Sequence, residues 1–140
     1  MKKRVLCFIV AVAMLLVAFP AFADSYSYEA GSIYRAYSFS KTRPSGNRSL
    51  KVSCTKLAYN GLTSGKDYCY ARPYSSDGAS LLGTRTKITR GDGLTPVPTN
   101  SSWDSASNYK LKIYNAYYVD NSNQSYQMAV EGGISYPFKY

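Results

Sequence analysis

The chain has no histidine among its 140 residues, so it lacks the side chain that most often serves as a general base or metal ligand near neutral pH. No serine lies in the motif of a hydrolase nucleophile. The eight carboxylates are spread mostly over predicted turns, where aspartate already has a structural role. We therefore expect a protein that is not an enzyme and needs no metal or cofactor. A carboxylate pair for glycoside hydrolysis is the remaining catalytic alternative.

Two short motifs resemble functional sites, and a turn explains each of them. Residues 120–123 (Asp-Asn-Ser-Asn) offer oxygen ligands but lack the glycine and the distal glutamate of an EF-hand loop. Arg90-Gly91-Asp92 spells the tripeptide that integrins bind, but Gly-Asp-Gly is also a good turn sequence. We expect turns at both places, and the sequence leaves open whether the tripeptide has a function.

The sequence has one long apolar run, and it lies near the N-terminus. Lys2, Lys3 and Arg4 precede an apolar run at residues 5–19, and Ala-Phe-Ala at 21–23 provides a small-x-small cleavage pattern. This order is typical of a signal peptide over residues 1–23, with an uncleaved membrane anchor as the alternative. Cleavage would leave a single secreted domain, residues 24–140, with no membrane span. It would also remove Cys7 and lower the net charge from +9 to +6.

Aliphatic side chains are few in the predicted secreted domain. Leu, Ile, Val and Phe account for 17 of its 117 residues, whereas all 15 tyrosines of the chain lie within it. Tyrosine buries a large ring and keeps a polar hydroxyl. We therefore expect a small, tyrosine-assisted core that needs additional stabilisation.

Cys54 and Cys69, the two cysteines of that domain, flank a turn-rich connector within residues 49–74. Small and aliphatic residues alternate with polar ones on both sides of the connector, as in half-buried strands. In an oxidising compartment this pattern predicts a β-hairpin linked by a Cys54–Cys69 disulfide, with Val52 opposite Ala71. Closing a loop of this size contributes about 3 kcal/mol.

The same alternation predicts further strands at residues 25–31, 33–41, 82–88, 108–115, 126–130 and 134–138, and no segment shows a helical period. Gly31 is either a bulge in one strand or a turn between two. Residues 117–119 extend the strand that begins at 108, and Gly132-Gly133 ends the strand that begins at 126. Residues 90–103 form a long loop. The fold class is therefore all-β: an antiparallel β-sandwich, or a small barrel, of seven to eight short strands.

Tyrosines and basic residues gather on particular strand faces. The polar face of the predicted hairpin and one face of residues 108–115 together hold Lys51, Tyr68, Tyr70, Arg72, Tyr74, Lys110, Lys112 and Tyr114. Aromatic rings stack on sugars, and Lys and Arg attract anions. These residues form a candidate surface for an anionic envelope polymer or glycan; we expect no nucleic acid. In the alternative, the tyrosines pack between sheets and the lysines keep the protein soluble.

The segment Lys41-Thr42-Arg43-Pro44, the two cysteine-bearing strands and the later Gly-Asp-Gly loop resemble, in layout, small exported β-sheet proteins of Gram-positive bacteria. The resemblance implies a secreted all-β domain and transfers no functional residues. Our first hypothesis is a secreted, non-enzymatic binding or structural module acting at the bacterial envelope or outside the cell. The alternative is a small secreted effector, bacteriocin-like or host-directed, that is attracted to anionic membranes. The sequence leaves the oligomeric state open.

Overall fold

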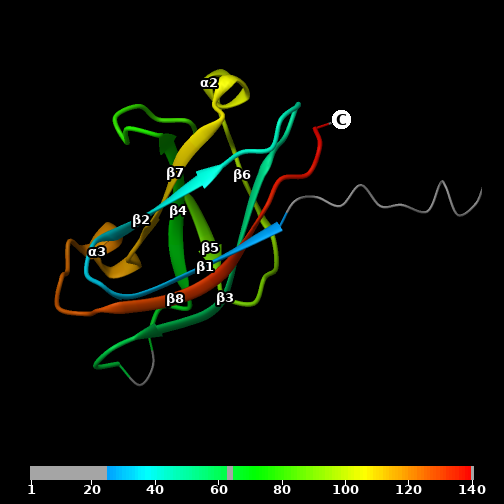
Figure 1. The fold of residues 1–140 in the computed structure, drawn as a ribbon. Coiled ribbons are helices and arrows are strands. Elements are labelled where there is room, and N and C mark those ends of the chain that lie inside the picture. Colours follow the sequence, from blue (N-terminus) through cyan, green and yellow to red (C-terminus); the bar gives the residue numbers. More distant parts are fainter. Residues whose placement is uncertain (1–24, 63–64, 140) are drawn as a thin grey trace, which may run out of the picture.

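The computed structural model describes residues 25–62 and 65–139, which form two four-stranded antiparallel sheets packed face to face (Figure 1). The first sheet has the strand order β1-β8-β3-β6, and the second has the order β2-β7-β4-β5. The elements are β1 (Ser25–Ile33), β2 (Ala36–Thr42), β3 (Leu50–Tyr59), β4 (Tyr68–Ser75), β5 (Thr86–Thr89), β6 (Thr95–Val97), α2 (Ser101–Ser105), β7 (Asn108–Tyr114), α3 (Ala116–Asn121) and β8 (Met128–Ser135). The predicted signal peptide, residues 1–23, lies outside the described residues.

The all-β prediction is confirmed as a sandwich of eight strands. Its core lies between the two sheets, where Trp103, Tyr109 and Tyr136 are among the largest fully buried side chains. The hydroxyl groups of Tyr109 and Tyr136 share a hydrogen bond of 2.6 Å, which satisfies both polar groups inside the core. Tyrosine rings therefore supply much of the volume that the few aliphatic side chains cannot. No helix within the described residues has the length and hydrophobicity to cross a membrane.

The predicted β-hairpin between Cys54 and Cys69 is wrong. Strand β3 pairs with β8 and β6 in the first sheet, while β4 pairs with β7 and β5 in the second, so Val52 is not opposite Ala71. Alternation identifies the buried face of a strand but not its partner. In a sandwich, inward-facing residues of consecutive strands can meet across the core. The two buried cysteines do so: they approach to 4.3 Å, which is not a bonding distance, and the structure contains no disulfide between them.

Two short helices and one short strand were missed in the sequence. Residues 117–119, expected in a strand, belong to α3, because the Asn115 side chain accepts hydrogen bonds from the first backbone N–H groups of that helix. The expected long loop at 90–103 contains β6 and the start of α2, which Asn100 caps in the same way. The strand expected over 82–88 is reduced to β5, preceded by isolated bridges at Leu81 and Gly83.

Glycine also has a different role from the expected one at Gly132-Gly133. These residues lie inside β8 rather than ending it. A Cβ atom on Gly132 would overlap the Ser53 carbonyl and the Tyr28 hydroxyl, which hydrogen-bond to each other at 2.7 Å. Gly132 is thus required by the close approach of β8 to that bond. Gly31 behaves as the first alternative predicted: β1 continues through it, with an irregular register between Ala30 and Ile33.

Candidate ligand-binding surface

Strands β4 and β7 bring most of the predicted surface residues together. Their register places Tyr70 opposite Tyr114, Arg72 opposite Lys112 and Tyr74 opposite Lys110. The intervening residues of both strands are buried in the core, so these side chains lie on the outer face of the second sheet. Seven of the eight predicted residues share this face: Tyr68, Tyr70, Arg72, Tyr74, Lys110, Lys112 and Tyr114.

Lys51 is the exception, and its predicted place on this surface is wrong. It lies on β3 in the first sheet, opposite Ser135 of β8 and Pro96 of β6. The error follows directly from the hairpin, because the predicted pairing of β3 with β4 was the argument that placed Lys51 beside the tyrosines.

Three basic residues belong to the surface and were missed. Lys87 on β5 lies opposite Tyr70, Arg85 precedes β5, and Lys66 precedes β4. The alternation around Ile88 indicated that Lys87 lay on a polar face, but only the pairing of β5 with β4 assigns that face to this sheet. We define the basic face as Lys66, Tyr68, Tyr70, Arg72, Tyr74, Arg85, Lys87, Lys110, Lys112 and Tyr114.

Cations cover the tyrosine rings of the basic face. The Lys87 ammonium lies 3.8 Å from the centre of the Tyr68 ring, and the Lys112 ammonium 4.1 Å from that of Tyr74. The Arg85 guanidinium lies 5.8 Å from the Tyr70 ring. Cation–π attraction of this kind holds the charged groups against the sheet. The rings therefore position cations, instead of presenting bare faces on which a sugar or base would stack.

One carboxylate closes the end of the basic face beside α3. Asp120 accepts hydrogen bonds from Lys66 Nζ at 2.5 Å, Tyr68 Oη at 2.6 Å and Tyr70 Oη at 2.8 Å. Burial opposes ionisation, but these hydrogen bonds and the Lys66 charge outweigh it and lower the pKa of Asp120 to about 2. Both carboxylate oxygens already have donors. The hydrogen bonds thus explain the position of Asp120 without a metal cation, the ligand that the oxygen-rich residues 120–123 resemble a site for.

The centre of the basic face is held by a second pair of hydroxyl groups. Tyr74 and Tyr114 share a hydrogen bond of 2.6 Å between their hydroxyls. Burial, together with that bond, raises the pKa of Tyr114 above its ordinary value. The charge of the face comes from its six Lys and Arg side chains, opposed by Asp120 at one end and by Asp77 near Lys110.

The other face of the sandwich holds the carboxylate pair that a hydrolase would need. Glu29 and Glu131 are opposite each other on β1 and β8, and both line a shallow depression of about 490 Å³ with Ser53 and neighbouring residues. The Lys56 ammonium lies 2.9 Å and 3.2 Å from the two carboxylate oxygens of Glu131. Lys56 therefore already occupies both oxygens of Glu131. The geometry is that of a cross-strand ion pair.

The Arg90-Gly91-Asp92 tripeptide lies in a hydrogen-bonded turn after β5. Arg90 N–H donates to the Asp67 carbonyl at 2.7 Å, and Gly91 N–H donates to the Cys54 carbonyl at 3.0 Å. Gly91 has a φ of 86°, a conformation that favours glycine. The backbone of the turn thus explains the glycine at this position.

Comparisons of the chain with protein-family models, with curated proteins and with solved structures found no match.

Proposed function

We propose that the chain is a secreted, non-enzymatic binding module that holds an anionic polymer of the bacterial envelope or extracellular space on its basic face. The observation that supports this most directly is the concentration of six cationic side chains over one sheet face, where the Asp120 carboxylate already accepts three hydrogen bonds. A patch of one charge attracts a flexible polymer of the opposite charge without needing a deep cleft.

The arrangement favours closely spaced anionic groups over neutral sugars. Side chains on one face of a strand repeat about every 7 Å, and neighbouring strands lie about 4.8 Å apart. The cations of β4, β5 and β7 therefore form a grid that several phosphates of one chain would contact together. Because Lys87 and Lys112 already occupy ring faces, sugar stacking contributes little. Among envelope polymers, a phosphodiester chain of the teichoic acid type fits this grid best.

The cysteine pair fits the same interpretation. We propose that Cys54 and Cys69, 4.3 Å apart in the structure, are oxidised to a disulfide after export. The neighbouring Cys69 thiol, assisted by the Arg90 charge, lowers the pKa of Cys54 against the opposing effect of burial. A lower pKa favours the thiolate that begins disulfide formation. The bond would join the two sheets across the core and so secure the sheet that presents the basic face.

The effector alternative needs apolar side chains that could enter a membrane beside the cations. Six large hydrophobic side chains are exposed in the described part of the chain. Of these, Leu81, which pairs with Tyr74, is the one next to the basic face. Interfacial insertion driven by these cations requires a continuous apolar surface beside them, so a single neighbouring leucine favours a polymer ligand over a lipid bilayer.

The test is binding of the purified chain to purified Gram-positive cell wall at increasing ionic strength. We expect binding to weaken steeply with salt, because exposed charges are screened. Lys112→Gln should weaken it about fivefold, and the triple variant Lys87→Gln/Lys110→Gln/Lys112→Gln about 100-fold, on the basis of about 1 kcal/mol per cation near an anionic surface.

Lys51→Gln is the matched control, since Lys51 carries the same charge on the opposite sheet. It should leave binding unchanged within about twofold. Equal losses for Lys51→Gln and Lys112→Gln, or binding that does not respond to salt, would contradict the proposal. The effector alternative would instead be supported if the unmodified chain caused dye to leak from anionic vesicles and the triple variant did not.

A further inference from the structure

The four edge strands of the sandwich differ in how well they are protected against pairing with another strand. Strand β5 has four residues, and β6 has three, including Pro96. Strand β1 has an irregular register and carries Glu29. Short length, proline, bulges and charges all discourage edge-to-edge pairing. Strand β2, by contrast, has seven residues in regular register with β7, and it contains neither proline nor an acidic residue.

Backbone hydrogen bonds at both ends of β2 show which of its groups are free to pair. Asn115 N–H donates to the Arg35 carbonyl at 2.8 Å, and Arg43 N–H donates to the Ser107 carbonyl at 2.7 Å. Both bonds continue the β2–β7 register, in which hydrogen-bonded and non-hydrogen-bonded pairs alternate. The odd-numbered residues thus bond to β7, and the N–H and C=O groups of the even-numbered residues point away from the sheet. These residues are Ala36, Ser38, Ser40 and Thr42, and all four are exposed.

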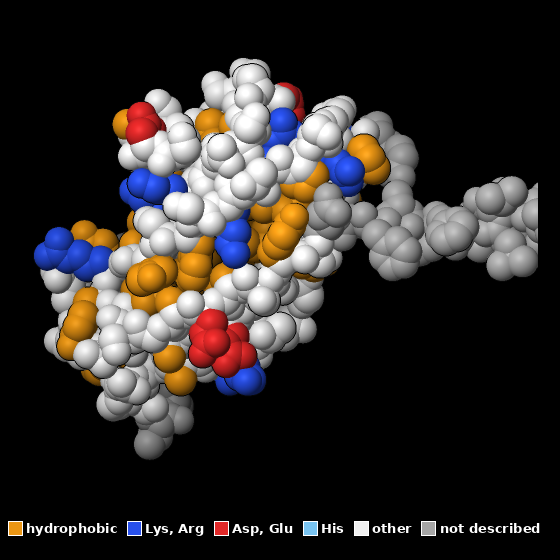
Figure 2. Space-filling view, viewed as in Figure 1, with side chains coloured by type: hydrophobic (Ala, Val, Ile, Leu, Met, Phe, Trp, Pro, Cys, Tyr) orange, Lys and Arg blue, Asp and Glu red, His pale blue; other side chains and the backbone are white. Residues whose placement is uncertain are grey.

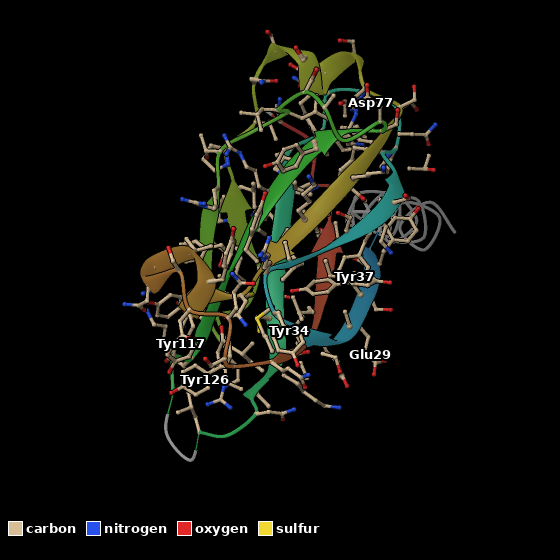
Figure 3. All side chains as sticks on the ribbon, turned by 90° about the vertical axis from the view of Figure 1, so that its left-hand side faces the viewer. Glu29, Tyr34, Tyr37, Asp77, Tyr117 and Tyr126 are labelled. Atoms are coloured by element: carbon tan, nitrogen blue, oxygen red, sulfur yellow. The ribbon has the colours of Figure 1, made fainter. Side chains whose placement is uncertain are left out.

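The side chains of β2 do not shield this edge. Lys41, its one charged residue, donates to the Ser27 carbonyl of β1 at 3.2 Å and so bends toward the other sheet. The Tyr37 ring is 49 % exposed and packs against the half-buried Phe39 ring, with 4.9 Å between ring centres. Hydrophobic side chains form a band across the side of the molecule on which β1 and β2 lie (Figure 2). Tyr34 and Tyr37 both lie on this side (Figure 3).

We infer that β2 pairs with β2 of a second copy of this chain, antiparallel and centred on Phe39. In that register Ser38 lies opposite Ser40 of the second copy, Ala36 lies opposite Thr42, and all four outward-pointing residues are paired. About eight backbone hydrogen bonds would form, two for each of the four residue pairs. The outward-pointing N–H and C=O groups of β2 are thereby hydrogen-bonded by the same strand of the second copy.

The side chains are complementary in the same register. Phe39 meets Phe39 of the second copy in a non-hydrogen-bonded pair, the closer of the two pair types. Tyr37 meets Lys41 of the second copy, which allows a cation–π contact. The two Lys41 residues stay four positions apart along the strands, about 13 Å, so they do not repel each other strongly. This self-complementarity is the reason for choosing a second copy over an unrelated strand.

Such a dimer would have one continuous eight-stranded sheet, with β2 and its symmetry mate at the centre. The two-fold axis relating antiparallel strands is perpendicular to the sheet, so both basic faces would lie on the same side. If the proposed polymer binding holds, a dimer would engage one polymer chain at two sites and bind it more tightly than a monomer. The pairing itself does not depend on that function.

The test is sedimentation of the purified chain over a range of concentrations, without any ligand. A contact of one strand pair is small, so we expect a reversible dimer with a Kd of about 10–100 μM. Ser38→Pro removes an outward-pointing N–H without disturbing a bond to β7, and it should raise the Kd at least about tenfold. Ser38→Ala, which keeps the N–H group, should dimerise like the unmodified chain. Far-UV circular dichroism checks that both variants fold.

Cross-linking then tests the register. An equimolar mixture of the single variants Ser38→Cys and Ser40→Cys should give a covalent dimer on mild oxidation, and neither variant alone should do so efficiently. If the chain stays monomeric at a protein concentration about ten times the expected Kd, the inference is overturned, and the edge is left for a strand of another protein. A dimer that Ser38→Pro leaves intact would overturn it as well, because its interface would lie elsewhere.

Discussion

Gly132 and Gly133 are neighbours on β8, and replacing each by alanine tests the packing of the first sheet from its two sides. On the inner side, the new Cβ of Gly132→Ala would overlap the Ser53 carbonyl and the Tyr28 hydroxyl. On the outer side, the new Cβ of Gly133→Ala would lie 3.1 Å from Ser53 Oγ, an atom that can rotate away. Neither glycine has a positive φ, so the backbone tolerates alanine at both positions and the difference between them is steric.

The two substitutions should therefore differ widely in cost. Overpacking a tight site costs about 1–3 kcal/mol. Displacing the Tyr28 hydroxyl from the Ser53 carbonyl leaves buried polar groups unpaired, which costs about 1–3 kcal/mol more. We expect Gly132→Ala to lower the free energy of unfolding by about 3 kcal/mol or more, a fall in Tm of about 10–15 °C for a domain of this size. Gly133→Ala should change it by less than about 1 kcal/mol.

The assay is urea unfolding followed by tyrosine fluorescence, with both variants in the same cysteine oxidation state. Adding Tyr28→Phe to Gly132→Ala removes the hydroxyl oxygen, one of the three overlapping atoms, and should recover about 1 kcal/mol relative to additivity. Equal urea midpoints for the two alanine variants would refute the close approach of β8 to the Tyr28–Ser53 hydrogen bond. So would purely additive behaviour of the double variant.

Three further predictions concern other parts of the molecule. Reducing the proposed Cys54–Cys69 disulfide should lower the free energy of unfolding by about 3 kcal/mol, measured by urea unfolding with and without reductant. Detection of two free thiols in the exported protein by mass spectrometry would disprove the bond. Because the pKa of Asp120 is lowered to about 2 when folded, its hydrogen bonds stabilise the fold above about pH 4 and are lost as the pH falls toward 2. Asp120→Asn should therefore show a smaller loss of stability over that interval than the unmodified chain, and identical pH profiles would argue against the Asp120 cluster. The buried Arg43 guanidinium donates hydrogen bonds to the carbonyls of Gly46, Asp104 and Ala106 at 2.7–2.8 Å. Arg43→Lys keeps the charge but loses this planar set of donors, so it should lower the free energy of unfolding by about 2 kcal/mol, measured by thermal unfolding. Unchanged stability would show that the planar guanidinium is dispensable.

Alternation alone was enough to find the face of each long strand. Along β4 and β7, the buried residues alternate with a second set that is mostly Tyr, Lys or Arg, and the buried set is small or aliphatic except for Tyr109. Period-two patterns follow from strand geometry itself, whatever the partner strands are. For this reason seven of the eight predicted surface residues do share one outer face, even though the argument that first grouped some of them used the wrong hairpin.

Strand partners could not be obtained in this way. Two strands close in sequence and rich in inward-facing small residues are compatible with pairing side by side or with facing each other across a core. The cysteines favoured the first interpretation, and the structure shows the second. Lys51 was misplaced and Lys87 was missed for this same reason. The short elements β6, α2 and α3 were missed because three to six residues are too few to show a period.

The sequence by itself determined that this protein is all-β with a tyrosine-assisted core, because composition and period-two alternation are local properties of the chain. Only the tertiary structure decided which strands share a sheet, which cations lie above which rings, and which edge stays open. Those features depend on contacts between residues far apart in the chain, and nothing in the local pattern encodes them.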